Sequence, residues 1–198
     1  SLKDRDQYSL IEYFNKYEKS VKQNCLRMLR LINNLIDITK IDSGMTKLDL
    51  VLVDIVPFVE DLTLSLIPYT KYKNLNITFD TNVEKLYLKI DTYAFERILL
   101  NLLSNAIKFN NFDGSILVSI ESSDTNVTIS IKDTGIGIPH GYPDATYNRF
   151  YKVDNSFSRR TEGSGIGLAI TKNLTELQGG RISINENYKD GSEFIITF

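Results

Sequence analysis

Apolar side chains recur at a seven-residue spacing from about Tyr8 to Ser43, a stretch without Pro or Gly. Alternating steps of four and three residues place ten positions on one stripe of a helix. These positions are Leu10, Phe14, Tyr17, Val21, Asn24, Met28, Leu31, Leu35, Ile38 and Asp42. The pattern therefore predicts one helix, roughly 50 Å long, that ends with Gly44 as a left-handed cap.

A single helix cannot bury this stripe. Ile11, Cys25 and Ile32 widen it on one side, which suits a helix of a bundle better than a narrow two-stranded seam. One alternative is that the helix folds back onto the rest of its own chain. Five successive heptads favour self-association between copies instead, with Asn24 fixing the register of the helices.

The rest of the chain, from Thr46 to Phe198, alternates between strand and helix periods. Strands are predicted at 47–53, 76–80, 85–90, 115–121, 126–132, 181–186 and 193–198. Helices are predicted at 56–72, 93–109 and 165–178. Asp91 precedes the second of these helices as a cap. Groups of adjacent strands with helices between them predict an α+β fold, a two-layer α/β sandwich behind a long N-terminal helix, and not a doubly wound parallel sheet.

The amino-acid composition of the chain excludes several kinds of binding site and partner. The 198 residues include 23 Lys and Arg against 25 Asp and Glu, a net charge of −2. No basic field exists to hold nucleic acid or an anionic membrane surface. One Cys and one His exclude an internal disulfide, a thiolate zinc cluster and any site that needs two imidazoles. Since no apolar run approaches about 20 residues, we expect a soluble, cytoplasmic segment, which leaves open a membrane anchor in a longer parent protein.

The helix predicted at 93–109 carries a polar face. Asn101, Asn105 and Lys108 stand at positions i, i+4 and i+7, opposite a set of apolar residues. An ordinary solvated face is the simpler interpretation, but Asn is a poor helix former and such faces favour Glu, Lys or Gln. Carboxamide oxygens and an ammonium suit a Mg²⁺–polyphosphate, because Mg²⁺ takes few protein ligands and fills its octahedron with phosphate and water.

A glycine turn follows the strand predicted at 126–132. Gly135 and Gly137 permit a positive φ and a close approach of the backbone to a ligand. Asp133, at the start of this turn, is a fixed acceptor suited to an exocyclic amine such as that of adenine. Taken alone, the segment is more simply explained as a plain glycine turn.

A second glycine-rich segment opens the last predicted helix. It contains Gly163, Gly165 and Gly167 and ends at Leu168. The exposed amides and the positive end of the helix dipole favour phosphate at such a place. The spacing fits neither the phosphate loop, since no Lys follows, nor the dinucleotide fingerprint, since no strand precedes it.

The order of these three segments resembles the ATP-binding catalytic domain of sensor histidine kinases, in the GHKL superfamily shared with gyrase, Hsp90 and MutL. Residues 101–109 resemble the N box, 133–137 the first glycine box and 163–168 the second. Residues 149–154 resemble the segment after the phenylalanine box. Residues 29–44 are similar to the second helix of the dimerisation and phosphotransfer hairpin, which favours the kinases within the superfamily. The resemblance assigns residues 1–45 to that helix and 46–198 to the catalytic domain.

The resemblance also implies a role for each matching position. Asn105, assisted by Asn101, would hold Mg²⁺, Lys108 would contact phosphate, and Asp133 would bind the adenine amine. Tyr151 and Lys152 would approach the phosphates when the lid closes. The resemblance supports this role less strongly for Arg159 and Arg160, which it places in the lid. The remaining nucleotide contacts implied are Gly135, Gly137, Gly163, Gly165, Gly167 and Leu168. Lys108 and Lys152 would neutralise charge during phosphoryl transfer.

The sequence departs from the family pattern at two places, and each departure predicts a difference from a typical member. In residues 140–146, Gly141 and Pro143 weaken the expected helix, and Tyr147 replaces a Phe, so we expect a loose or differently docked lid. His140, the single histidine, lies in this loop and not on an acceptor helix. We therefore expect an ATP-dependent protein-histidine kinase fragment that cannot phosphorylate itself and acts on a His absent from this chain.

Two other functions remain open. One is a nucleotide-binding interaction module without kinase activity, which signals through its helix. The other is an ATPase or serine kinase of the same superfamily. Glu96 lies five residues before Asn101 and so faces away from it, which argues against hydrolysis. The expected cofactors are ATP and Mg²⁺, and the expected protein partner, through the parent protein, is a response regulator.

Overall fold

The computed structural model describes residues 17–18, 21–22, 24–25, 28–29, 31–40, 43–44, 47–138, 145–148 and 165–198. The chain divides into two compact units, residues 1–45 and 46–198. In the first, residues 31–40 form a continuous helix, and Gly44 has a φ of +65°, the left-handed conformation expected at its end. Six stripe positions among the described residues are exposed, and Ile38 is buried. The exposed ones are Tyr17, Val21, Asn24, Met28, Leu31 and Leu35.

The second unit contains strands, α-helices and two short 3₁₀ helices, labelled η. In chain order they are β1 (Val51–Asp54), α2 (Ile55–Ser65), α3 (Ile67–Thr70), η1 (Lys71–Lys73), β2 (Asn76–Thr81), β3 (Tyr87–Ile90), α4 (Thr92–Phe109), β4 (Ser115–Ser122), β5 (Val127–Asp133), η2 (Ala145–Tyr147), α5 (Gly167–Leu177), β6 (Arg181–Ile184) and β7 (Ser192–Thr197).

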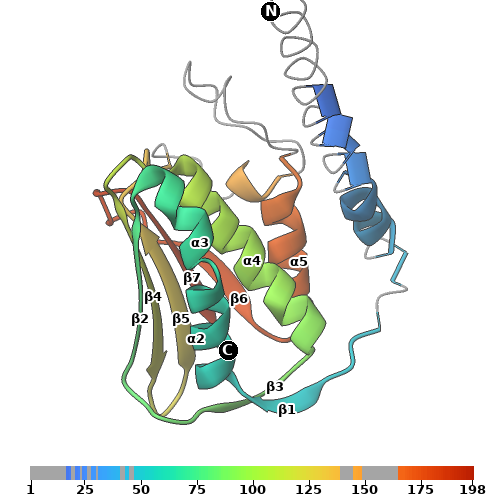
Figure 1. Ribbon diagram of the computed structural model, residues 1–198. Coiled ribbons are helices and arrows are strands. Elements are labelled where there is room, and N and C mark those ends of the chain that lie inside the picture. Colours follow the sequence, from blue (N-terminus) through green and yellow to red (C-terminus); the bar gives the residue numbers. More distant parts are fainter. Residues whose placement is uncertain are drawn as a thin grey trace, which may run out of the picture. The chain divides into compact units, whose positions relative to one another are not determined.

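Five strands form one sheet in the order β2-β4-β5-β7-β6. β2 and β4 run parallel, and the other neighbouring pairs run antiparallel. β1 and β3 form a separate antiparallel pair. Helices α2, α4 and α5 lie on one face of the sheet (Figure 1). The α+β class and the two-layer arrangement predicted from the sequence are confirmed.

The core lies between this helical layer and the sheet. Strand residues alternate, so that Ile116 and Val118 of β4 are buried beside Ile129 and Ile131 of β5. The buried face of α4 meets them with Phe95 and a run of aliphatic side chains. These aliphatic residues are Ile98, Leu99, Leu102 and Leu103. Because α4 is anchored along its whole length, its opposite, polar face has a fixed orientation.

Some predicted boundaries are wrong. The single helix expected at 56–72 is broken at Leu66, where α2 ends, and the chain continues as α3 and η1. Pro68 explains the break, because its ring would clash with the carbonyl of Leu64 in a continuous helix, whereas Pro fits the first turn of a new one. Residues 47–50 and 85–86 are not strand, so β1 and β3 are shorter than expected.

Within the described part of the chain, no helix combines the length and the apolar character needed to cross a lipid bilayer.

Candidate functional site

The polar face of α4 is the first component of the site. Asp91 caps the helix as predicted, since its Oδ1 accepts a hydrogen bond from the amide of Ala94 at 2.9 Å. Asn101, Asn105 and Lys108 are all half-buried, in contrast to the exposed positions of an ordinary solvated face. The Lys108 ammonium lies 4.5 Å from the centre of the Phe109 ring. The predicted face therefore exists and is partly enclosed.

Asn101 connects α4 to the beginning of α5. Its Nδ2 donates a hydrogen bond to Oγ1 of Thr171 at 2.7 Å. A Cβ added at Gly167 would collide with the Asn101 side chain, so a larger residue at the first position of α5 would displace that side chain. The structure thus brings α4 and the second glycine segment into direct contact, and the Asn101 side chain joins them.

The α5 end of the site combines glycines with an uncapped helix start. Gly165 has a φ of +68°, which glycine adopts without strain. Ile166 stands at the N-cap and supplies no side-chain cap, so the first-turn amides of α5 are not capped in the usual way. Leu168 follows, half-buried, in the first turn. This helix start has the features that favour an anion.

Asp133 ends β5 on the helical side of the sheet and is 4% exposed. Its Oδ1 accepts hydrogen bonds from the amides of Gly135 at 2.9 Å and Ser192 at 3.4 Å. Desolvation by burial raises the pKa of the Asp133 carboxyl, and hydrogen bonds from Gly135 and Ser192 oppose that shift. The carboxyl group is therefore held in a fixed position and partly stripped of water, as an acceptor for a ligand amine would be.

The first glycine segment packs directly on the end of α4. The amide of Ile136 donates to the carbonyl of Phe109 at 3.1 Å. A Cβ at Gly135 would collide with the same carbonyl, so the close approach depends on glycine. Gly137 has a φ of +72°, again a conformation suited to glycine. α4 thus contacts the Asp133 loop at its C-terminal end and α5 at Asn101.

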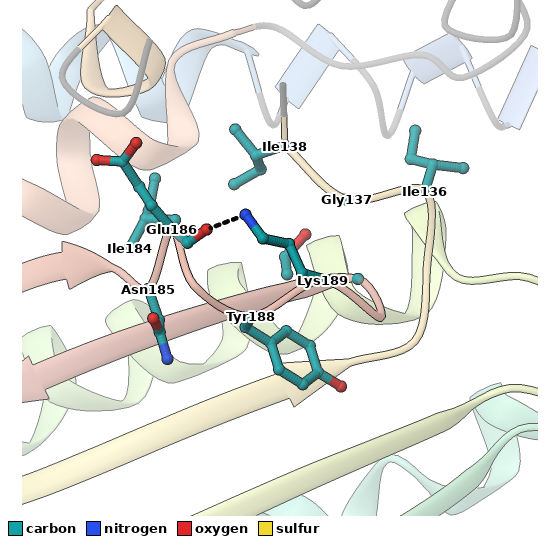
Figure 2. A pocket seen from close by; sticks show the side chains of 10 residues that line it. Ile136, Gly137, Ile138, Ile184, Asn185, Glu186, Tyr188 and Lys189 are labelled. Atoms are coloured by element: carbon teal, nitrogen blue, oxygen red, sulfur yellow. Dashed lines mark hydrogen bonds between the residues drawn. The ribbon is translucent and has the colours of Figure 1, made fainter. Parts of the chain in front are cut away.

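A cavity of about 210 Å³ lies between this loop and the hairpin that joins β6 to β7. Figure 2 shows Ile136 and Ile138 on the loop side and Tyr188 and Lys189 on the hairpin side. The Lys189 ammonium donates to the carbonyl of Glu186 at 2.8 Å (Figure 2). The complete lining is Ile136, Gly137, Ile138, Ile184, Asn185, Glu186, Tyr188, Lys189, Gly191 and Ser192.

Sequence reasoning missed Ser192 and Tyr188. Ser192 faces Asp133 across the β5–β7 pair, and Gly191 leaves room for the Asp133 backbone. Burial raises the pKa of the Tyr188 hydroxyl, and the nearby carboxylates of Asp190, Asp133 and Glu193 raise it further. The Gly-Ser pair before the last strand was visible in the sequence, but its position opposite Asp133 depends on strand pairing.

Several predicted residues lie outside the described part of the chain. They are Tyr151, Lys152 and Gly163 among the nucleotide contacts, His140, the lid residues Arg159 and Arg160, and the segment 149–154. Tyr147 is described: it is 8% exposed, η2 contacts α5, and the Lys172 ammonium lies 5.5 Å from the centre of its ring. At this one position the segment is packed against the domain and is not loose.

The side chains of the site could bind Mg²⁺ only together with a bound molecule, such as a polyphosphate, that supplies further oxygen atoms to the ion. Among the described residues, no group of three or more His, Cys, Asp and Glu side chains could hold a metal ion. Asn105 offers a neutral carboxamide oxygen at the partly enclosed face of α4. This sparse set fits Mg²⁺, which is typically held by one or two protein groups together with phosphate oxygens and water.

Residues 90–198 match the family described as histidine kinase-, DNA gyrase B- and HSP90-like ATPases. The chain belongs to this family. Sensor histidine kinase GacS of Pseudomonas protegens is 34% identical over 193 residues, which cover 94% of this chain and 20% of GacS. WalK of Bacillus subtilis, also a sensor histidine kinase, is 34% identical over 158 residues, which cover 79% of this chain and 26% of WalK.

Solved structures of histidine kinases share the fold of this ATPase-family chain. The full-length structure of ShkA in complex with AMPPNP superposes with a TM-score of 0.75 at 25% identity, over 86% of this chain and 35% of ShkA. The histidine kinase AdeS of Acinetobacter baumannii superposes with a TM-score of 0.71 at 22% identity, over 90% of this chain and 80% of that chain. This chain spans about a tenth to two fifths of the curated relatives with the strongest matches.

Proposed function

We propose that this chain is the ATP-binding catalytic portion of a sensor histidine kinase and transfers the γ-phosphoryl group of ATP to a histidine on a separate helix. The observation that carries the proposal is the double contact of α4. At Asn101 it meets the glycine start of α5, and at Phe109 it meets the loop that follows Asp133. Between these contacts lie Asn105 and Lys108, the two side chains suited to a metal-bound polyphosphate.

Each described group has a task in this proposal. Asp133 accepts a hydrogen bond from the adenine amine, and Gly135 and Gly137 let the base approach the backbone. Gly165, Gly167 and Leu168 present the first-turn amides of α5 to phosphate. Lys108 neutralises phosphate charge, which is the main demand of phosphoryl transfer. We assign Tyr151, Lys152 and Gly163 to the same site from their sequence positions alone.

Mg²⁺ is part of the proposal. Asn105 would supply the protein oxygen to the ion, with Asn101 beside it. The Asn101 amide nitrogen donates to Thr171, and its Oδ1 is the atom of this group that can bind a cation. A bound Mg²⁺ supplies charge neutralisation on the phosphate oxygens.

The partners follow from the same proposal. The acceptor histidine belongs to the other helix of a dimerisation and phosphotransfer hairpin, for which residues 1–45 provide the second helix and a self-association surface. A response regulator then receives the phosphoryl group through the parent protein. We assign this segment to the cytoplasm, where ATP is supplied.

The test supplies the acceptor separately. The chain is mixed with γ-labelled ATP, Mg²⁺ and an acceptor-helix segment taken from a histidine kinase relative, and the label is followed on both proteins. We expect ATP binding by the chain, label on the acceptor segment and no stable phosphohistidine on the chain itself. Asn105→Ala should abolish transfer, whereas Asn126→Ala, an exposed Asn in the turn between β4 and β5, should leave it unchanged.

The other outcomes discriminate between functions. ATP binding without transfer to any of several acceptor segments favours a nucleotide-binding interaction module. Release of phosphate without an acceptor favours an ATPase. Absence of ATP binding, measured by calorimetry on the intact chain, contradicts the proposal.

A further inference from the structure

Lys73 closes the C-terminal end of α4 from outside the helix. Its Nζ donates hydrogen bonds to the carbonyl of Lys108 at 2.7 Å and to that of Asn110 at 2.8 Å. The last carbonyls of a helix have no partner within it, and a cation favours the negative end of the helix dipole. Asn110, the C-cap residue, is extended, and Asn111 after it does not have a positive φ, so the left-handed cap that many helices use is absent here. The Lys73 ammonium takes that place.

Lys73 itself is held in position by the loop that follows α4. Its carbonyl accepts a hydrogen bond from the amide of Asp113 at 3.0 Å. The next residue, Asn74, is left-handed with a φ of 52°, and its Nδ2 donates to Oδ1 of Asp113 at 2.8 Å. Burial removes part of the water around the Lys73 ammonium and lowers its pKa.

The end of α4 that Lys73 contacts is also part of the proposed nucleotide site. Between Lys108 and Asn110 lies Phe109, whose carbonyl accepts the hydrogen bond from the amide of Ile136. Gly135 packs on the same carbonyl. The end of α4 is therefore bonded to Lys73 and, one residue away, to the loop that follows Asp133. A displacement of this end would move Lys108 and the loop together.

We propose that Lys73 is a positioning residue of the nucleotide site: without contacting ATP, it fixes the end of α4 so that Lys108 and residues 134–138 take the geometry that binds nucleotide. This inference rests on the proposed function for its consequence on ATP. The local coupling from Lys73 to Ile136 does not depend on that function and can be measured without nucleotide.

The experiment compares Lys73→Met with Lys71→Met in the intact chain. Methionine keeps the long apolar stem and removes the donor. Lys71 lies in the same 3₁₀ helix and is exposed, so it controls for the loss of a surface charge. Three quantities are measured: the Kd for Mg²⁺–ATP by calorimetry, hydrogen exchange of the Ile136 amide by NMR well below the unfolding temperature, and the unfolding temperature itself.

For Lys73→Met we expect about a tenfold weaker Kd, the size of one charge-assisted hydrogen bond. We also expect about tenfold faster exchange at Ile136, with amides in the centre of β5 unchanged. Lys73→Arg, which keeps charge and donors, should recover most of both effects. If Lys73→Met does not fold, Lys73→Gln carries the test, because its shorter amide keeps at most one of the two bonds and should shift both quantities in the same direction.

The inference is overturned if the Lys73 variant matches the Lys71 variant within twofold in the exchange rate at Ile136, whatever happens to its unfolding temperature. It is also overturned if Kd changes while Ile136 exchange does not. Should the unaltered chain fail to bind Mg²⁺–ATP, the proposed function fails, but faster Ile136 exchange in Lys73→Met alone would still support the positioning role.

Discussion

Asn101 and Thr171, seventy residues apart in the chain, are joined by a hydrogen bond of 2.7 Å from the Asn101 Nδ2 to the Thr171 Oγ1. Thr171 is 1% exposed, so neither water nor a mobile side chain substitutes easily for this contact. The bond links the helix that carries the predicted metal ligands to the helix whose first turn is suited to phosphate.

Replacing Thr171 by valine tests the strength of this link. Valine keeps the shape and leaves the Asn101 amide without its acceptor, so we expect a loss of about 1–2 kcal/mol in the free energy of unfolding. Thr175→Val is the matched control, since Thr175 is equally buried and its Oγ1 donates only to the carbonyl of Thr171 within α5. Chemical denaturation of both variants should show the larger loss for Thr171→Val; equal losses would contradict the importance of the link.

Gly167→Ala should act through the same contact. The added methyl group would meet the Asn101 side chain and push it away from Thr171. Because both substitutions break one interaction, we expect the double variant Gly167→Ala/Thr171→Val to lose less stability than the sum of the two single variants, by about 0.5–1 kcal/mol. Additive losses in denaturation experiments would show that the Gly167 substitution does not act through the bond between Asn101 and Thr171.

Asp133→Asn should raise the stability of the domain and weaken its binding of ATP. The pKa of the Asp133 carboxyl is raised, so the folded state holds the proton of this group more tightly than the unfolded state does. The stability gained from the protonated form is complete below the unfolded pKa of about 3.9 and is lost as pH rises through the folded pKa. At pH 7 the neutral amide avoids this cost, so we expect the variant to unfold a few degrees higher, roughly 2–4 °C.

Two measurements check this prediction. Thermal unfolding as a function of pH should show the advantage of Asp133→Asn near neutrality and its disappearance toward pH 4. Calorimetry at pH 7 should show at least about a tenfold weaker affinity for ATP, because an amide donor replaces the acceptor for the adenine amine. A variant that binds ATP normally would remove Asp133 from the site.

Leu35→Glu tests the exposed helical stripe. Leu35 is 56% exposed and lies on the heptad stripe. We expect the unaltered chain to self-associate as its concentration rises, and the charge at a seam position to shift it to the monomer. Asn33→Glu places the same charge on an exposed position off the stripe and should not do so. Sedimentation velocity distinguishes these outcomes, and an unaltered chain that is monomeric at every concentration contradicts the expectation.

Local signals in the sequence predicted the elements of the fold well. Asp91 is the clearest example, because the cap of α4 depends on a few neighbouring residues. The end of α2 at Leu66 was predicted wrongly, because the apolar period continues through this residue and only the clash introduced by Pro68 divides the helix. This clash is also a local effect, so the sequence contains the information needed to predict the division.

One part of the candidate site was predictable from the sequence, and another part depends on the tertiary fold. The polar face of α4 follows from helical periodicity, and the structure confirms that Asn101, Asn105 and Lys108 share a partly enclosed face. The contacts of Lys73 with α4 and of Ser192 with Asp133 link residues 35 and 59 positions apart along the chain. Their geometry follows from strand order and helix packing, and no local pattern in the sequence encodes it.

The parallel pairing of β2 with β4 has a consequence for how the domain opens. The chain between these strands passes through β3 and α4, so α4 is fastened to paired strands at both of its ends. α5 is followed instead by β6, an edge strand held by one antiparallel neighbour. We therefore expect the half of the site on α4 to open only together with the core. The half on α5 has fewer strand constraints and should open at a lower free energy.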